Sequence, residues 1–215
     1  MPPEPPTVPV RLLLATTSAG KLRELNDLLS GLPLQLVSPP DVGAALHVEE
    51  TGASFRENAV LKATAFARAA GLPALADDSG LEVDALGGEP GVRSHRYGAT
   101  DADRMARLLA RLQDVPEGQR TARFRCVLAL ATPAGLVGTA EGTCEGRIAR
   151  EPRGENGFGY DPIFWLPERG RQGVRTLAEL EPPEKNAISH RARAAAGARR
   201  LIQAWLLDAA PGSRA

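Results

Sequence analysis

The chain has 215 residues, which is enough for one large domain with a substantial apolar core. Its 26 basic and 26 acidic residues cancel to a formal charge of zero, so neither a nucleic acid nor an anionic membrane surface is indicated as a partner. The two cysteines, Cys126 and Cys144, fit no disulfide framework and no metal-ligand spacing, so we expect buried thiols in a reducing cytoplasm. No apolar run approaches the roughly 20 residues of a membrane span.

The two ends of the chain differ in composition from the rest. Residues 1–9, MPPEPPTVP, are rich in proline and lack the basic start and apolar middle of a signal peptide. We expect them to form a disordered arm, and residues 209–215 to form a disordered tail. Residues 10–208 show no internal repeat and no linker, so they are predicted to be a single domain, with two lobes around a cleft.

The first elements follow one another closely. VRLLLA, residues 10–15, is an apolar run typical of a buried strand. A helix is expected to begin after Ser18, a good N-cap, and to end at Gly31. LQLV, residues 34–37, reads as a second short strand. A second helix should begin after Ser54, where Glu57 completes a capping box, and should end at Gly71.

The remaining segments alternate in the same way. PALA and LEVDAL, residues 73–76 and 81–86, are predicted as strands on either side of the acidic segment DDSG. A helix is predicted over 101–113, and two long strands separated by Pro133-Ala134-Gly135 read as a hairpin. An irregular strand over 158–167 and a closing helix over 184–207 complete the chain. The pattern predicts an α/β fold with an elongated mixed β-sheet flanked by helices.

The segment TTSAGK, residues 16–21, joins the first strand to the first helix. A small polar turn with Gly-Lys before a helix suggests phosphate binding, because helix N-termini favour anions. The segment departs twice from G-x-x-x-x-G-K-[ST], since Ala15 replaces the first glycine and Leu22 replaces the magnesium-binding hydroxyl residue. These departures disfavour a P-loop kinase, and leave a phosphate turn of another kind or an ordinary capped turn.

Carboxylates gather in two further segments. Asp77 and Asp78 are adjacent in DDSG, where one side chain should face away from the other. Either could serve a hard cation such as Mg²⁺, or the segment could be a simple turn before Gly80. Glu49 and Glu50 lie in a polar loop and would become candidate metal ligands only if they approached Asp77 or Asp78.

Cations and aromatic residues gather towards the end of the chain. The aromatic rings of residues 154–162, GENGFGYDP, could stack on a base. Three cationic or ionisable side chains, Lys185, His190 and Arg191, lie at the start of a helix in residues 184–191, EKNAISHR. Lys62 lies on the rim of the second helix's apolar stripe, where a snorkelling lysine is the simpler interpretation.

Taken in order, these segments resemble one known family. TTSAGKLREL, EETGASFRENAVLKA, ADDSGLEVDALGGEPGVRSHRYG, GFGYDPIF and EKNAISHR resemble the inosine triphosphate pyrophosphatase family, over residues 10–207. The resemblance implies Mg²⁺-dependent hydrolysis of ITP, dITP and XTP to a nucleoside monophosphate and pyrophosphate. It also implies an elongated α/β fold with a long mixed sheet and two lobes around the cleft, in subunits that form a homodimer.

The resemblance also assigns roles to residues. It makes Asp78 the catalytic acidic residue and places the metal on Asp78 and Glu49, with Glu50 as a rival to Glu49. It gives substrate binding to Thr16, Thr17, Ser18, Ala19, Gly20, Lys21, Lys62, Ser79, Phe158, Gly159, Tyr160, Asp161, Lys185, His190 and Arg191. One departure is visible, because the family usually has Asn where this chain has Ser18.

The expected chemistry is attack of water on a phosphorus atom, with Asp78 acting as metal ligand or base. Donors on His190 and Arg191 would favour a 6-oxo purine over adenine. Two other functions stay open: a pyrophosphatase of the related septum-inhibitor type for modified or pyrimidine nucleotides, and a non-catalytic nucleotide-binding module.

Overall fold

The computed structural model describes residues 9–44, 46–167 and 175–209. Most of the predicted terminal arm and tail lie outside these residues. Ala209, predicted to begin the tail, is instead the last residue of the final helix. No helix among the described residues is long and apolar enough to cross a membrane.

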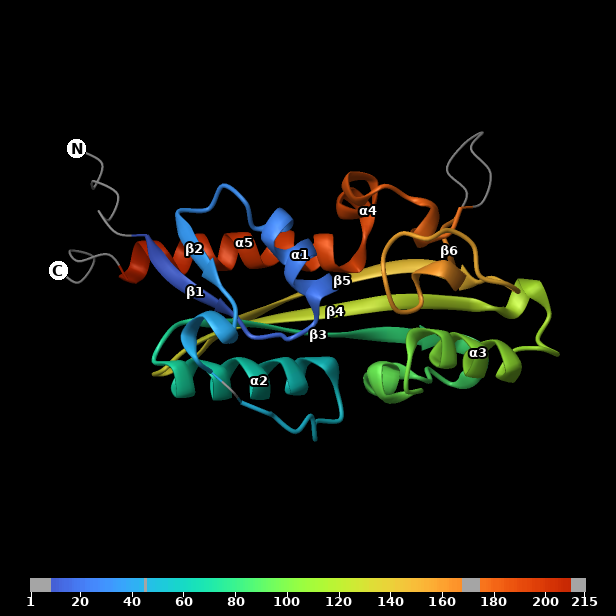
Figure 1. Cartoon of the computed structure of the whole chain (residues 1–215), viewed down its shortest axis with the longest axis horizontal. Helices are drawn as coiled ribbons and strands as arrows, with labels where there is room; N and C mark the ends of the chain where they lie inside the picture. The colour runs from blue at the N-terminus through green and yellow to red at the C-terminus, as the bar shows by residue number, and fades with distance from the viewer. Residues whose placement is uncertain (1–8, 45, 168–174, 210–215) are drawn as a thin grey trace. The chain divides into compact units, whose positions relative to one another are not determined.

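Helices and strands alternate through the first half of the chain, and a pair of long strands follows (Figure 1). In chain order the elements are β1 (Val10–Leu14), α1 (Ala19–Leu28), β2 (Leu34–Val37), α2 (Phe55–Ala70), β3 (Ala74–Val83), α3 (Asp101–Arg111), β4 (Thr121–Thr132), β5 (Gly135–Ile148), β6 (Phe164–Trp165), α4 (Pro182–Ile188) and α5 (His190–Ala209).

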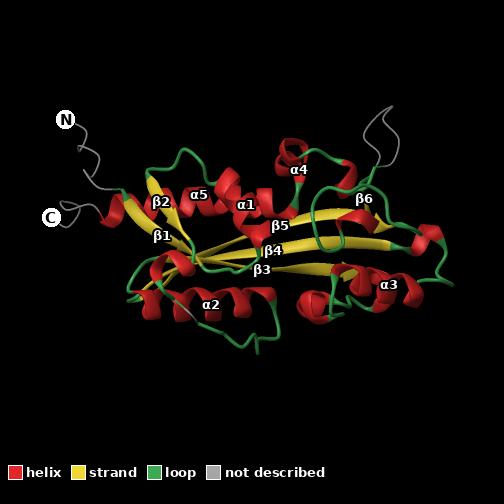
Figure 2. Cartoon of the chain, viewed as in Figure 1, coloured by secondary structure: helices red, strands yellow, loops and turns green. Residues whose placement is uncertain are grey.

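The six strands form one mixed sheet in the order β2-β1-β3-β4-β5-β6 (Figure 2). β1 pairs in parallel with both β2 and β3, as expected for strands joined through helical crossovers. β6 pairs antiparallel with β5. The α/β prediction with a mixed sheet is therefore confirmed.

The chain divides into two compact units. The first unit contains residues 1–77, 128–140 and 195–215, and the second contains residues 78–127 and 141–194. Strands β3, β4 and β5 and helix α5 each contribute residues to both units. One boundary falls inside β3, between Asp77 and Asp78.

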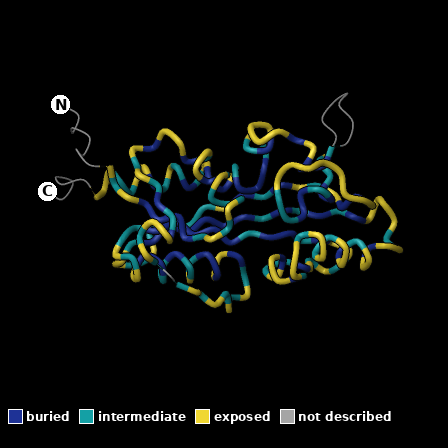
Figure 3. The backbone as a smooth tube through the Cα atoms, in the orientation of Figure 1, coloured by how far each residue is buried: buried dark blue, intermediate teal, exposed yellow. Residues whose placement is uncertain are grey.

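In the first unit, α2 and α5 lie on opposite sides of the strands (Figure 1). The leucines of β1, residues 12–14, are buried, as are Ala59 and Ala63 on α2. Helix α5 comes close to β5 through small residues, because a Cβ atom on Gly197 would lie 2.9 Å from the Cβ of Ala140. Arg199 of α5 also donates to the carbonyl of Ser30 (2.7 Å), which ties α5 to the end of α1. Figure 3 shows the buried strands as dark blue and the outer loops as exposed.

In the second unit, an apolar core forms between the strands, α3 and the segment that carries β6. Its buried members are Leu81, Val83, Tyr97, Leu108, Leu112, Ala122, Phe124, Cys144, Ile148, Tyr160, Ile163, Phe164, Leu177 and Leu180. Cys126 and Cys144 are both buried and take part in no disulfide bond, as predicted. Arg120 is also buried, but its guanidinium donates to the carbonyls of Ile148 (2.9 Å) and Ala149 (2.9 Å). This arginine therefore has a structural role.

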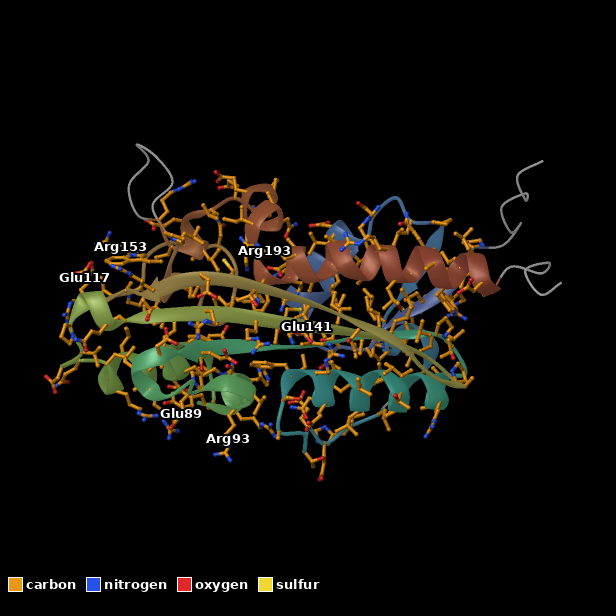
Figure 4. The ribbon with its side chains drawn as sticks, turned by 180° about the vertical axis from the view of Figure 1, so that it is seen from behind. Glu89, Arg93, Glu117, Glu141, Arg153 and Arg193 are labelled. Carbon is orange, nitrogen blue, oxygen red and sulfur yellow. The ribbon has the colours of Figure 1, made fainter. Side chains whose placement is uncertain are left out.

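The exposed face of the strands in the second unit carries charges of both signs. Arg125 on β4 lies 3.6 Å from Glu82 on β3 and 3.7 Å from Glu141 on β5. Figure 4 labels Glu141 on β5 and Arg193 on α5. Cross-strand pairs of opposite charge of this kind stabilise adjacent strands only modestly.

Two predicted elements need correction. The segment DDSG was predicted to separate two strands, but β3 runs without interruption from Ala74 to Val83. The closing helix is interrupted at Ser189, whose extended backbone (φ −65°, ψ 161°) separates α4 from α5. In both places a regular sequence pattern was overridden locally, by strand pairing in the first case and by Ser189 as C-cap in the second.

Smaller differences concern helix ends and turns. Helix α1 ends at Leu28, three residues before Gly31, which has a positive φ of 77° in the following turn. Ser54 caps α2 as predicted, but Glu57 accepts from the N–H of Ala53 (2.7 Å) in place of the N-cap N–H. The irregular strand predicted over 158–167 is a short 3₁₀ turn followed by β6.

Candidate functional site

The turn between β1 and α1 is ordered by its own hydroxyl groups. The N–H of Ser18 donates to Oγ1 of Thr16 (3.2 Å), and Oγ of Ser18 accepts from the N–H of Lys21 (3.5 Å). Ser18 is therefore the N-cap predicted from the sequence. The positive end of the α1 dipole lies at this turn, which favours an anion there.

Lys21 stands on the first turn of α1 and forms an ion pair with the carboxylate of Asp77 on β3. The Asp77 side chain is fully buried, whereas 19% of the Lys21 side chain is exposed. A buried carboxylate requires a partner of this kind, because an isolated charge is costly in an apolar interior. The helix start and β3 are thus joined at the residue that the sequence singled out for phosphate binding.

Lys62 approaches the same part of β3 from α2. Its ammonium donates to the main-chain carbonyl of Asp77 (2.7 Å) and to the carboxylate of Glu50 (2.9 Å). Only 12% of the Lys62 side chain is exposed, so the snorkelling interpretation is wrong. Two predicted phosphate-binding lysines of the first unit therefore meet at a single residue, Asp77.

The acidic loop is fixed by a residue that the sequence analysis did not identify. Asn58 on α2 is buried, and its Oδ1 accepts from the N–H of Gly52 (2.8 Å). A Cβ atom at position 52 would lie 2.8 Å from that oxygen, so glycine is required there. Glu50 turns towards Lys62, whereas Glu49 is exposed. The only signal in the sequence was Asn58 at a buried position of the α2 stripe.

In the second unit, Asp78 and Ser79 continue β3. Asp78 is buried, with 5% of its surface exposed. Oγ of Ser79 accepts from the guanidinium of Arg191 (3.0 Å), which is almost fully buried. The contact joins two predicted substrate-binding residues that are separated by 112 positions in the sequence.

Lys185 and Arg191 both lie against the ring of Phe158. The ammonium of Lys185 is 4.8 Å from the ring centroid, and the guanidinium carbon of Arg191 is 5.5 Å from it. Both distances fall within the range of a cation–π interaction. The aromatic ring and the two cations therefore form one cluster.

Asp161 contacts both Lys185 and the backbone of the loop that carries Phe158. Its Oδ2 accepts from the ammonium of Lys185 (2.5 Å) and from the N–H of Phe158 (2.9 Å). The Asp161 and Lys185 side chains are 3% and 5% exposed. Since the carboxylate is turned inward, we infer that Asp161 supports the loop, and that the neighbouring groups are better placed to contact a ligand.

Two further residues fix the loop that carries Phe158. The hydroxyl of Tyr160 donates to the carbonyl of Ser94 (2.9 Å), and burial raises the pKa of that hydroxyl above its usual value. The N–H of Gly159 donates to Asp101 (2.8 Å), at the start of α3. Asp101 was not predicted as part of the site, because its sequence context indicates only the first turn of a helix.

His190 begins α5 and stacks on Phe124. The two rings lie 4.7 Å apart at an angle of 12°. A Cβ atom on Gly142 of β5 would collide with the carbonyl of His190 and with the N–H of Ala194. The backbone of β5 and the first turn of α5 therefore touch, and this contact fixes where His190 and Arg191 lie within the second unit.

The predicted site residues thus form two groups. The first unit holds the Thr16–Lys21 turn, Lys62 and Glu49, and the second unit holds Asp78, Ser79, the Phe158–Asp161 loop and the cluster of Lys185, His190 and Arg191. Within each unit the structure brings members of the set into contact. Asp77, Asn58 and Asp101 are additional residues that hold these members in place.

The fold is α/β, with a capped helix start and two lysines in the first unit and an aromatic ring contacted by two cations in the second. The sequence profile of the Ham1 family matches residues 12–201. The chain belongs to the Ham1 family.

Curated relatives cover most of the chain. The dITP/XTP pyrophosphatase of Geobacillus kaustophilus is 53% identical over 186 residues, which is 85% of this chain and 89% of that protein. The dITP/XTP pyrophosphatase of Pseudomonas aeruginosa is 53% identical over 190 residues, covering 86% of this chain and 93% of that protein.

Solved structures agree with the fold. A HAM1 protein from Coxiella burnetii has a TM-score of 0.79 and 44% identity, covering 91% of this chain and 99% of that one. The nucleoside-triphosphatase, or dITP/XTP pyrophosphatase, of Mycobacterium abscessus has a TM-score of 0.68 and 48% identity, covering 88% of this chain and 97% of that one.

Proposed function

We propose that this chain hydrolyses the deaminated purine nucleotides dITP, ITP and XTP to a nucleoside monophosphate and pyrophosphate. The names of its relatives support this activity. The observation that carries it is the placement of Lys21 and Lys62 beside the capped start of α1, since a triphosphate needs several positive groups at one place.

The first unit is proposed to bind the phosphates. The backbone of residues 16–21 offers N–H donors at a helix start, and the hydroxyls of Thr16 and Thr17 add short polar groups. Lys21 and Lys62 supply positive charge that offsets the charge of the phosphates. This arrangement differs from a P-loop, because its second lysine comes from α2.

The second unit is proposed to bind the base. Phe158 offers a ring for stacking, which is worth about 1–3 kcal/mol per base. His190 and Arg191 supply donors for a 6-oxo group, where adenine carries an amine. Burial strengthens such discrimination, because an amine facing these donors would leave them unpaired.

Mg²⁺ is proposed as the cofactor, and the residues present fit it by their chemistry. Glu49 and Asp78 offer carboxylate oxygens, the ligands that Mg²⁺ prefers. Glu50 is the weaker candidate, because its carboxylate accepts from Lys62. Mg²⁺ at such sites is commonly held by one or two carboxylates and by substrate phosphates. Bound Mg²⁺ would neutralise phosphate charge and polarise the phosphoryl group.

The products define the bond that breaks. A water molecule attacks the α-phosphorus, the bond to the bridging oxygen of the β-phosphate breaks, and the water loses its proton. Asp78 is proposed to orient this water, either as the base that receives its proton or as a metal ligand, in which case the proton passes to solvent. Lys21 and Lys62 are proposed to stabilise the leaving pyrophosphate.

The test is product identification by chromatography, with purified protein, Mg²⁺ and a panel of dITP, ITP, XTP, GTP, ATP and dTTP. We expect monophosphate and pyrophosphate from dITP, ITP and XTP, and little from ATP. Release of single phosphates, or preference for dTTP, would contradict the proposal. Asp78→Asn should reduce turnover by at least about 100-fold while nucleotide binding stays measurable.

We also propose that the chain acts as a cytoplasmic homodimer. The family resemblance supports the dimer, and the buried thiols agree with a reducing compartment. Light scattering coupled to size-exclusion chromatography measures the mass of the particle, and a monomeric mass at micromolar concentration would contradict the dimer.

A further inference from the structure

Asp77 makes two contacts that converge on the phosphate-binding group of the first unit. Its buried carboxylate pairs with the ammonium of Lys21, and its main-chain carbonyl accepts from Lys62 at 2.7 Å. These lysines come from different helices, α1 and α2, and both contact the same residue of β3. Asp77 thus contacts both ammonium groups, one through its carboxylate and the other through its carbonyl.

We propose that Asp77 is a positioning residue of the hydrolytic reaction, one that holds Lys21 and Lys62 where the substrate phosphates bind. The inference rests on the proposed function, because it assigns the two lysines to the triphosphate. Asp77 itself is not assigned a contact with substrate.

The chemistry of lysine explains why such a residue is needed. A lysine ammonium sits on a flexible four-carbon stem, so an unrestrained side chain samples many positions. Charged groups assist a reaction most when they are already in place as charge develops. The carboxylate of Asp77 restrains Lys21 in this way, while the 19% exposure of the Lys21 side chain leaves part of it accessible to a ligand.

Asp77 and the neighbouring catalytic candidate, Asp78, lie on opposite faces of β3. Side chains of consecutive strand residues point to opposite faces, and β3 is regular through Asp77 and Asp78. Asp77 therefore turns to Lys21 on one face, and Asp78 is presented on the other. This geometry gives the two neighbouring carboxylates different tasks.

A double-mutant cycle tests the proposal. The four proteins are the wild type, Lys21→Met, Asp77→Asn and the double variant, and the measurement is kcat and KM for dITP at saturating Mg²⁺. We expect Asp77→Asn to lower kcat about 10- to 100-fold with a smaller change in KM, and to have little further effect once Lys21 is Met. Asp84→Asn, which removes a carboxylate from an exposed pair with Arg123, is the matched control and should leave kcat unchanged.

Equal losses in both backgrounds would overturn the proposal, because Asp77 would then act independently of Lys21. A shift in the Mg²⁺ concentration for half-maximal rate would also overturn it, since Asp77 would then serve as a metal ligand. If Asp77→Asn does not fold, Asp77→Glu replaces it in the cycle. That variant keeps the charge and displaces it by one methylene group, and the same non-additivity is expected.

A separate readout does not depend on turnover. The side-chain ammonium of Lys21 should give a slowly exchanging NMR signal in the wild type and in Asp84→Asn, and should lose it in Asp77→Asn. If the wild type hydrolyses no nucleotide, the function proposal fails, and this signal still decides whether Asp77 restrains Lys21. An unrestrained Lys21 ammonium in the wild type would overturn the inference.

Discussion

Asp161→Ala tests how the loop that carries Phe158 is held. The substitution removes the carboxylate that pairs with Lys185 at 2.5 Å and accepts from the N–H of Phe158 at 2.9 Å. Both ionic side chains are at most 5% exposed, so the ammonium would be left in a buried position without its carboxylate. Breaking one partner of a buried pair costs about 3–5 kcal/mol.

The lost contact to Phe158 adds to this loss. The N–H of Phe158 is only partly buried, so the loss of its hydrogen bond costs about 0.5–1.5 kcal/mol. The expected decrease in unfolding free energy is therefore at least about 3 kcal/mol, a large part of the 5–15 kcal/mol that is typical of a folded domain. The assay is urea denaturation followed by circular dichroism, with linear extrapolation to water.

Two comparisons make the result specific. Asp161→Asn combined with Lys185→Met removes both charges, and should recover much of the lost stability. Glu151→Ala removes a carboxylate from an exposed pair with Arg153 in the same unit, and should change stability little. A loss below about 1 kcal/mol for Asp161→Ala would refute the reasoning from burial.

Three further outcomes are expected. Gly142→Ala should destabilise the protein and lower dITP turnover, because the added Cβ would collide with backbone atoms of α5. Gly118→Ala is the control, since position 118 has open space around it, and it should change neither the thermal unfolding temperature nor the rate. Arg191→Lys should lower the ratio of kcat/KM for ITP over ATP about 10-fold or more, since lysine cannot reproduce a planar guanidinium; an unchanged ratio would exclude Arg191 from base selection. Hydrogen bonds from Arg123, and to a smaller extent from Thr121, lower the pKa of Asp84 in the folded protein. The Asp84–Arg123 pair therefore stabilises the fold at pH values above the unfolded pKa of about 3.9, and this stabilisation is lost as the pH falls through the folded pKa. Arg123→Met should therefore be less stable than the wild type near neutral pH, by no more than about 1 kcal/mol, and the two should converge in acid; a difference that grows in acid would contradict this sign.

Much of the fold could be predicted from local patterns. The apolar runs of β1 and β2, and the N-caps Ser18 and Ser54, are dictated by nearby residues and were found where predicted. The family prediction is confirmed by the match to the Ham1 profile. The predicted activity agrees with the names of the relatives.

The features that could not be predicted depend on contacts between residues far apart in the sequence. DDSG contains turn-forming residues, yet it is part of a strand because neighbouring strands pair with it. The role of Asp77 depends on Lys21, which is 56 residues away, and the contact of Asp101 with Gly159 spans 58 residues. No local pattern encodes such pairs, so the contacts of Asp77 and Asp101 were not predicted, although Asp77 itself was named as a possible cation ligand.

The unbroken course of β3 has a consequence for how this chain can vary. Asp77 lies on the face of β3 towards Lys21, and Asp78 on the other face, only while the number of residues between the start of β3 and the two carboxylates stays constant. Deleting or inserting one residue within 74–76 would exchange the faces of the two carboxylates, and would turn the wrong one towards Lys21. Changes in length should therefore be tolerated in the connections before and after β3, whereas within the strand a change of residue type is less harmful than a change in residue count.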